Sequence, residues 1–170
     1  MVSGPESSGK STLAQALGRH LKWTVVPEFA RTYLEGIAGK SYSRKDFDKI
    51  VAGQFNAERI AEMNTRQPLI CDTSVVVLHI WHLEKWGNVH PLVQERLKSV
   101  EQTYFLLCQP DIPWVYDPLR EHPEGRELLY RQYKSVLKSC GFHYAEIGGT
   151  LSHRLEMASF HIKKWMEGLD

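Results

Sequence analysis

Residues 4–12 read Gly-Pro-Glu-Ser-Ser-Gly-Lys-Ser-Thr and satisfy the pattern G-x-x-x-x-G-K-[ST]. The two glycines let the backbone curl so that successive N–H groups face inward and can bind phosphate oxygens. Leu13, Leu17 and Leu21 follow at helical spacing, so the loop leads into a helix whose positive N-terminal end favours the same anion. The stretch predicts a phosphate-binding loop between a strand and a helix, and this connection decides the fold class.

Within the loop, the side chains have separate expected roles toward ATP and Mg²⁺. Lys10 is expected to reach the β- and γ-phosphates, and the Ser11 hydroxyl to bind Mg²⁺. Thr12 is placed to touch the α-phosphate. A chance Gly/Ser turn is the alternative, which the helical run after the loop disfavours. The residues expected to surround the nucleotide phosphates are Gly4, Glu6, Ser7, Ser8, Gly9, Lys10, Ser11 and Thr12.

Outward from the loop, short apolar runs alternate with longer segments of helical period, which is typical of an α/β sheet protein. Only Met1-Val2-Ser3 is available for the strand before the loop, so that strand is either short or preceded by residues upstream of Met1. The segment after Ser74 is ambiguous, because its three valines also suit one long strand over residues 69–81. The predicted strands are residues 23–27, 68–72, 103–108 and 142–147, and the predicted helices begin near Gly9, Phe29, Ser43, Ser74, Pro91, Glu124 and Leu151.

Composition limits the functional classes. The chain has 170 residues, 42% of them hydrophobic, which fits one domain spanning residues 1–170. A net charge of +1 lacks the broad basic field of a nucleic-acid binder. No apolar run suits a membrane span or a signal peptide, and three scattered cysteines favour free thiols in the cytoplasm. Cys71 and Cys108 lie in apolar runs and are expected to be buried.

Two acidic residues follow predicted strands, where a phosphate-loop protein needs them. Leu69-Ile70-Cys71-Asp72 is an apolar strand ending in a carboxylate, and we expect Asp72 to hold Mg²⁺ through water. Glu28 follows a second strand, with Arg31 one helical turn later, and small kinases place there an acid that takes the proton of a substrate hydroxyl. A glutamate that merely favours the helix N-terminus is the alternative.

Two further features of the sequence limit the class of phosphate-loop protein. The guanine-specific pattern N-K-x-D is absent, which argues against a GTPase. After the fourth predicted strand, residues 109–126 are rich in Pro and Gly and carry Asp117, Arg120 and Arg126. Small kinases use such a segment as a mobile lid that covers the phosphates, and we expect Arg120 and Arg126 to neutralise charge there. A solvated surface loop is the alternative reading.

Four separated segments resemble the ribosylnicotinamide kinase domain of NadR-type proteins, also described as an AAA-like ATPase/kinase family. They are Gly4-Pro5-Glu6-Ser7-Ser8-Gly9-Lys10-Ser11, Pro27-Glu28-Phe29-Ala30-Arg31, Cys71-Asp72-Thr73 and Trp114-Val115-Tyr116-Asp117-Pro118-Leu119-Arg120.

The resemblance implies a three-layer P-loop NTPase fold, with a mainly parallel five-stranded sheet and a helical or loop lid. It also implies ATP-dependent phosphorylation of the 5′-hydroxyl of nicotinamide riboside, giving nicotinamide mononucleotide. Glu28 and Arg31 would lie in the nucleoside pocket, and Asp117 and Arg120 in the lid. Either Glu28 or Asp72 is expected to orient or deprotonate the hydroxyl. Aromatic rings that could sandwich the base are Trp81, Trp86, Tyr33 and Trp114.

The chain departs from the family pattern at two positions. Ser74 stands where the family often has a second acid, so a substrate or metal contact of that acid is not carried over. Pro118 replaces a common glycine. The adenylyltransferase domain of bifunctional members is not among these residues, and its activity is not carried over. Three alternatives remain: another small-molecule kinase, for instance of deoxynucleosides; a regulatory ATP-binding module with little turnover; and a nucleic-acid-linked ATPase, which fits the charge balance poorly. Neither a nucleic-acid nor a membrane partner is expected, and the oligomeric state is open.

Overall fold

The computed structural model describes residues 1–37, 41–100, 102–119 and 124–168. Its strands all pair in parallel, and a bridge between Val2 and Asp72 joins a two-stranded and a three-stranded sheet. The strand order is therefore β2-β3-β1-β4-β5, and the predicted α/β fold with a parallel sheet is confirmed. The strands are β1 (Val2–Ser3), β2 (Val25–Val26), β3 (Ile70–Cys71), β4 (Tyr104–Cys108) and β5 (His143–Ile147).

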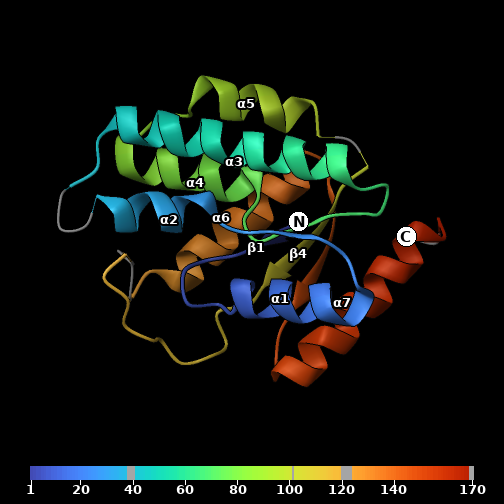
Figure 1. Ribbon diagram of the computed structural model, residues 1–170. Helices are drawn as coiled ribbons and strands as arrows, with labels where there is room; N and C mark the ends of the chain where they lie inside the picture. The colour runs from blue at the N-terminus through green and yellow to red at the C-terminus, as the bar shows by residue number, and fades with distance from the viewer. Residues whose placement is uncertain (38–40, 101, 120–123, 169–170) are drawn as a thin grey trace.

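Helices cover both faces of this sheet (Figure 1). Helices α1 and α7 lie together on one face, and α2 to α6 lie on the other. No helix in the described ranges has the length and apolar character needed to cross a membrane. The helices are α1 (Lys10–Leu21), α2 (Phe29–Gly36), α3 (Arg44–Asn64), α4 (Val75–Trp86), α5 (Pro91–Lys98), α6 (Arg126–Ser139) and α7 (Leu151–Met166).

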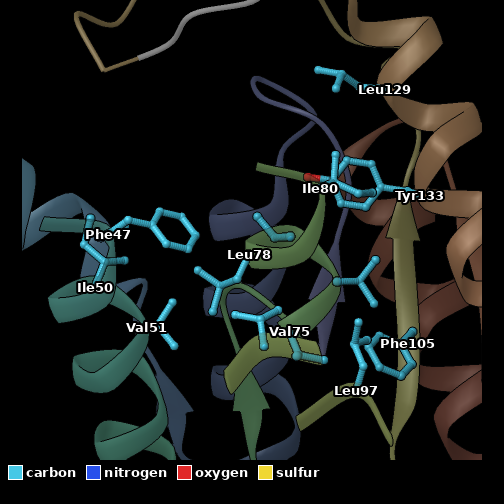
Figure 2. Packing of buried hydrophobic residues seen from close by; sticks show 14 of the residues in the cluster. Phe47, Ile50, Val51, Val75, Leu78, Ile80, Leu97, Phe105, Leu129 and Tyr133 are labelled. Atoms are coloured by element: carbon cyan, nitrogen blue, oxygen red, sulfur yellow. The ribbon is translucent and has the colours of Figure 1, made fainter. Parts of the chain in front are cut away.

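Strand β4 divides the core into two clusters. Every residue of this strand is buried, as expected for a parallel strand with helices on both sides. Successive side chains point to opposite faces, so Phe105 and Leu107 pack against α2 to α6, whereas Leu106 and Cys108 pack against α1 and α7. Figure 2 shows the first cluster, in which side chains from α3, α4 and β4 meet. This core holds the carboxyl ends of the strands in place beneath the phosphate loop.

The two cysteines of the apolar runs are buried, as predicted. Burial raises the pKa of the Cys71 thiol to about 12 and that of Cys108 to about 11. Both thiols therefore stay protonated at neutral pH and serve as small apolar groups, since a thiolate is the reactive form.

The ambiguous segment after Ser74 is helical, and the alternative of one long strand over residues 69–81 is wrong. The Ser74 side chain accepts a hydrogen bond from the N–H of Val77 at 3.3 Å, which caps the first turn of α4. Val75 and Val76 are buried in the core of α2 to α6. Tertiary packing around the whole first turn therefore outweighs the weak helix propensity of β-branched residues.

The other predicted boundaries are close to the observed ones. Strands predicted at 23–27 and 68–72 are shorter than expected, with Val25–Val26 and Ile70–Cys71 in the ladder. Proline at each predicted edge, Pro27 and Pro68, lacks the N–H that would extend the pairing. The helix predicted from Glu124 begins at Arg126.

Helix α3 begins with a capping box whose loss we expect to destabilise the protein. The Ser43 hydroxyl accepts from the Asp46 N–H, and the Asp46 carboxylate accepts from the Ser43 N–H at 2.8 Å. Ser43→Ala removes a cap worth about 1 kcal/mol, so thermal denaturation should show a melting temperature about 2–4 °C lower. Ser135→Ala, at an exposed position inside α6, is the matched control and should not lower it. Equal melting temperatures for Ser43→Ala and the wild type would contradict the role of the cap.

Candidate active site

The phosphate loop adopts backbone conformations that its glycines make possible. Gly4 has φ +137° and Gly9 has φ +82°, both in the left-handed half of the map. A Cβ on Gly4 would also lie 2.7 Å from the carbonyl oxygen of Cys108, so the loop lies against the end of β4 in a way that only glycine allows. Gly9 is the N-cap of α1 and makes no side-chain cap, which leaves the first N–H groups of the helix open toward the loop.

Lys10 lies back over this loop. Its ammonium Nζ donates to the carbonyl oxygen of Pro5 at 2.8 Å, and the Ser8 hydroxyl donates to the same oxygen at 2.8 Å. The positive charge is therefore held beside the curled backbone, where the negative charge of a bound phosphate would meet it.

The predicted lid segment is in contact with the loop. Arg126 Nη1 donates to the carbonyl oxygens of Ser7 at 3.2 Å and Ile112 at 2.9 Å. The N–H of Val115 donates to the Ser7 hydroxyl at 3.0 Å. Arg126 thus lies at the loop, and its role toward a bound phosphate stays a prediction; Arg120 falls outside the described residues.

Asp72, at the carboxyl end of β3, fits a magnesium site. Burial raises the pKa of its carboxyl group, and the Ser11 hydroxyl and the positive charge of Lys10 oppose that rise. The Oδ1 atom is buried and accepts no hydrogen bond from the described part of the chain. A buried carboxylate oxygen without a donor, beside a hydroxyl, is the kind of oxygen pair that Mg²⁺ prefers. Asp72 and Ser11 are therefore the residues that would hold the metal.

Ser74, where the family often has an acid, has a structural role. It is fully buried, and its hydroxyl shares a hydrogen bond of 2.6 Å with the hydroxyl of Ser3. The same hydroxyl caps α4. The side chain ties the first turn of α4 to β1, and it does not line the cavity described below.

Glu28 is the N-cap residue of α2. Its Oε1 accepts a hydrogen bond from the Thr73 hydroxyl at 3.2 Å. Burial is the main cause that raises the pKa of this carboxyl group; Lys10 opposes the rise and Asp72 adds to it. The three charged groups therefore act on one another, and of the two acids Glu28 lines the cavity whereas Asp72 does not.

The structure also brings together Arg31 and Asp117, which are 86 residues apart. The Arg31 guanidinium contacts the Asp117 carboxylate at 2.8 Å and the Glu35 carboxylate at 3.5 Å. Asp117 accepts a further hydrogen bond from the N–H of Leu119 at 3.0 Å. The pair connects α2, which contributes Arg31 to the cavity described below, to the predicted lid segment.

A cavity of about 240 Å³ is lined by the phosphate loop, by Glu28 and Arg31, and by aromatic side chains that we call its aromatic end. Trp81 lines that end, and its indole N–H donates to the hydroxyl of Tyr42 at 2.6 Å. Tyr42 was not singled out from the sequence, because no motif surrounds it. The residues that line the cavity are Gly4, Pro5, Glu6, Ser7, Ser8, Gly9, Lys10, Ser11, Thr12, Glu28, Ala30, Arg31, Leu34, Tyr42, Val77, Ile80, Trp81, Glu84, Lys85, Leu119, Leu129 and Tyr133.

The other three aromatic candidates have different surroundings. Trp86 packs edge-on against the ring of Phe47, and the Tyr33 hydroxyl donates to Asp46 at 2.8 Å. Trp114 lies beneath the guanidinium of Arg126, whose Cζ is 5.8 Å from the ring centroid. None of these three rings lines the cavity, and a role for Trp114 in substrate binding stays a prediction.

Arg154, in the first turn of α7, reaches the phosphate loop although no sequence motif points to it. Its Nη1 donates to the carbonyl oxygen of Ser8 at 2.7 Å. A buried arginine far along the chain leaves no signal in the local pattern, because its partners are distant backbone carbonyls.

Comparison with known sequences identifies relatives of this site. The sequence model of a family described as an AAA domain matches residues 1–154. The chain is 30% identical over 139 residues to the trifunctional NAD biosynthesis/regulator protein NadR of Escherichia coli (strain K12), covering 80% of this chain and 33% of that protein. It is 30% identical over 122 residues to the NadR of Salmonella typhimurium, covering 70% and 30%. The chain spans about a third of the length of these curated relatives.

Solved structures show the same fold. A NadR protein in complex with NAD and AMP-PNP superposes with a TM-score of 0.73 at 19% identity, covering 96% of this chain and 48% of that one. The YorR protein of Bacillus subtilis, in complex with phosphorylated GDP, superposes with a TM-score of 0.52 at 17% identity, covering 98% and 96%. Together with the phosphate loop and the matched sequence model, these findings show that the chain belongs to the AAA domain family of P-loop proteins and is related to NadR.

Proposed function

We propose that the protein transfers the γ-phosphoryl group of ATP to the 5′-hydroxyl of a nucleoside, and that nicotinamide riboside is the acceptor, giving nicotinamide mononucleotide. One observation carries the proposal: a single cavity is lined by the phosphate loop, by Glu28 and Arg31, and by aromatic rings. Relatives that are named for NAD biosynthesis, and a structural neighbour that holds NAD and AMP-PNP, support this choice of acceptor.

Catalysis would depend mainly on positioning and on charge neutralisation. The loop N–H groups and Lys10 hold the triphosphate, and Arg126 adds a positive charge at Ser7. Ser11 and Asp72 would hold Mg²⁺, which when bound neutralises charge on the β- and γ-phosphates. Arg120 is proposed to cover the transferring phosphoryl group and to neutralise its negative charge.

Glu28 is the proposed general base. It lines the same cavity as the phosphate loop and the aromatic rings, so its carboxylate would be available to a 5′-hydroxyl directed at the γ-phosphate. Burial raises its pKa, and a base whose pKa lies closer to neutrality accepts a proton more effectively. Asp72 does not line the cavity, which favours its assignment to the metal over the role of base.

The aromatic end would recognise the base of the acceptor. The indole of Trp81 and the ring of Tyr42 offer apolar faces on which a planar ring can stack. Lys85 Nζ lies 3.7 Å from the centroid of Tyr42, so one face of this ring already holds a cation, and Trp81 is the proposed stacking surface for the base. Glu84 and Lys85 both line the cavity, so a bound base would lie near one negative and one positive side chain.

The experiment is an acceptor panel with purified protein, ATP and Mg²⁺. Nicotinamide riboside, the ribonucleosides and the deoxynucleosides are each supplied, ADP formation is measured, and products are identified by mass. We expect the highest kcat/KM with nicotinamide riboside and a product heavier by one phosphate. Preference for a deoxynucleoside would assign another kinase, and ATP binding without turnover would assign a regulatory module. The free cysteines agree with a cytoplasmic enzyme, which we propose as its location.

A further inference from the structure

Arg154 lies where three segments of the chain meet. Its side chain is 3% exposed, so its hydrogen bonds are made away from water. Nε donates to the carbonyl oxygen of Gly149 at 2.8 Å, in the turn between β5 and α7. Nη1 donates to Ser8 in the phosphate loop at 2.7 Å, and Nη2 donates to Gln109, just after β4, at 3.2 Å. One planar guanidinium thus connects the phosphate loop with the ends of the two neighbouring strands.

Asp111 fixes this guanidinium. Its Oδ1 is paired with Arg154 Nη2, and its Oδ2 accepts the N–H of Gly149. The acid balances the charge of the buried arginine and also holds the turn from which the arginine extends. Because such buried pairs add little net stability, this geometry is better explained by orientation than by stability alone.

The orientation matters because of the geometry of the peptide bond. In a trans peptide the carbonyl of one residue and the N–H of the next point in opposite directions. Arg154 holds the Ser8 carbonyl on the outer side of the loop, so the N–H of Gly9 is directed to the inner side. Arg126 acts in the same way on the Ser7 carbonyl and thereby on the N–H of Ser8. Outward carbonyls with inward N–H groups are what an anion-binding backbone nest requires.

We propose that Arg154 is a positioning residue of the phosphate loop: it holds the Ser8–Gly9 peptide so that the Gly9 N–H faces a bound phosphate, and Asp111 orients it. The residue itself does not line the cavity. This inference rests on the proposed function only in requiring that the loop bind a triphosphate; it does not depend on the acceptor.

The test compares ATP with inorganic tripolyphosphate, which has the phosphates without the nucleoside. Dissociation constants for both are measured by calorimetry at 25 °C for the wild type, Arg154→Met, Arg154→Lys and the control Arg19→Met, an exposed arginine on α1. In Arg154→Met we expect both constants to rise by the same factor, about tenfold or more, the scale of one hydrogen bond to a charged group. The acceptor KM should stay unchanged, and Arg19→Met should match the wild type.

The variant Arg154→Lys separates charge from geometry. Lysine keeps the positive charge but cannot contact Ser8, Gly149 and Asp111 together, so its constants should lie between those of the wild type and Arg154→Met. If Arg154→Met does not fold, the test rests on Arg154→Lys. If Arg154→Lys then binds ATP and tripolyphosphate as tightly as the wild type does, the proposal is overturned.

Two further outcomes are distinct. If Arg154→Met binds ATP more weakly but tripolyphosphate as well as the wild type, Arg154 acts on the nucleoside. If its melting temperature falls while both dissociation constants are unchanged, its role is purely structural. Each of these outcomes overturns the proposal. Failure of the wild type itself to bind either ligand would instead refute the proposed function.

Discussion

Lys10→Ala should remove nearly all phosphoryl transfer while the fold survives. The Lys10 ammonium lies over the phosphate loop at 2.8 Å from the Pro5 carbonyl, and it is the loop's own positive side chain. Removing a preorganised group that stabilises developing charge lowers kcat by about 10²–10³-fold. The side chain belongs to neither hydrophobic cluster, so the melting temperature should change by no more than about 2–4 °C. Steady-state kinetics and thermal denaturation check both parts.

Lys45→Ala is the matched control for this prediction. Lys45 is exposed near the start of α3 and lies outside the cavity, so its loss removes one positive charge without touching the loop. It should keep wild-type kcat. If Lys10→Ala and Lys45→Ala were equally active, the phosphate loop would not hold the reacting triphosphate.

Glu28→Gln should lower kcat by about 10²-fold or more, the usual range for loss of a general base. Glutamine has nearly the same shape and can still accept the hydrogen bond from Thr73, so the local structure should persist. Burial raises the pKa of Glu28, which means that the ionised carboxylate costs stability at pH values above its unfolded-state pKa. A neutral glutamine removes that cost, and the melting temperature at neutral pH should not fall. Glu95→Gln, exposed on α5, is the control.

The pH profile gives a second measure of the same role. A general base acts only when it is unprotonated, so wild-type kcat should fall as the pH drops through the pKa of Glu28. Because that pKa is raised, the fall should begin at a higher pH than for an exposed glutamate. Glu28→Gln should lose this acid limb. If Glu28→Gln instead changes only KM, Glu28 binds the ribose, and Asp72 becomes the better candidate for the base.

Much of the candidate site was predictable because its residues belong to short local sequence motifs. The loop pattern placed Lys10 and Ser11, and an apolar run ending in a carboxylate placed Asp72. The motif that contains Glu28 starts at the end of a strand, and parallel strands bring their carboxyl ends to one edge of the sheet. The structure places these side chains within electrostatic reach of one another, as the pKa shifts of Glu28 and Asp72 indicate.

The aromatic end of the cavity was only partly predictable. Trp81 is one of four aromatic residues that the sequence does not distinguish, and no local motif points to Tyr42. Whether a ring faces the cavity or the core depends on how α4 rotates against α3 and α6. The buried Val75 and Ile80 determine that rotation, and neither carries a chemical motif.

The sequence by itself determined the phosphate loop, the alternation of strands and helices, and the acids that end the strands. These features depend on neighbouring residues, through backbone conformation, periodicity and capping. Only the tertiary structure decided which distant groups hold the loop. A backbone carbonyl oxygen can accept a hydrogen bond from any donor, so its partner depends on which helix packs next to it. Arg154 is 146 residues from Ser8 in the sequence and contacts it because α7 packs beside α1. The residues around Arg154 do not predict which carbonyl oxygen it will contact.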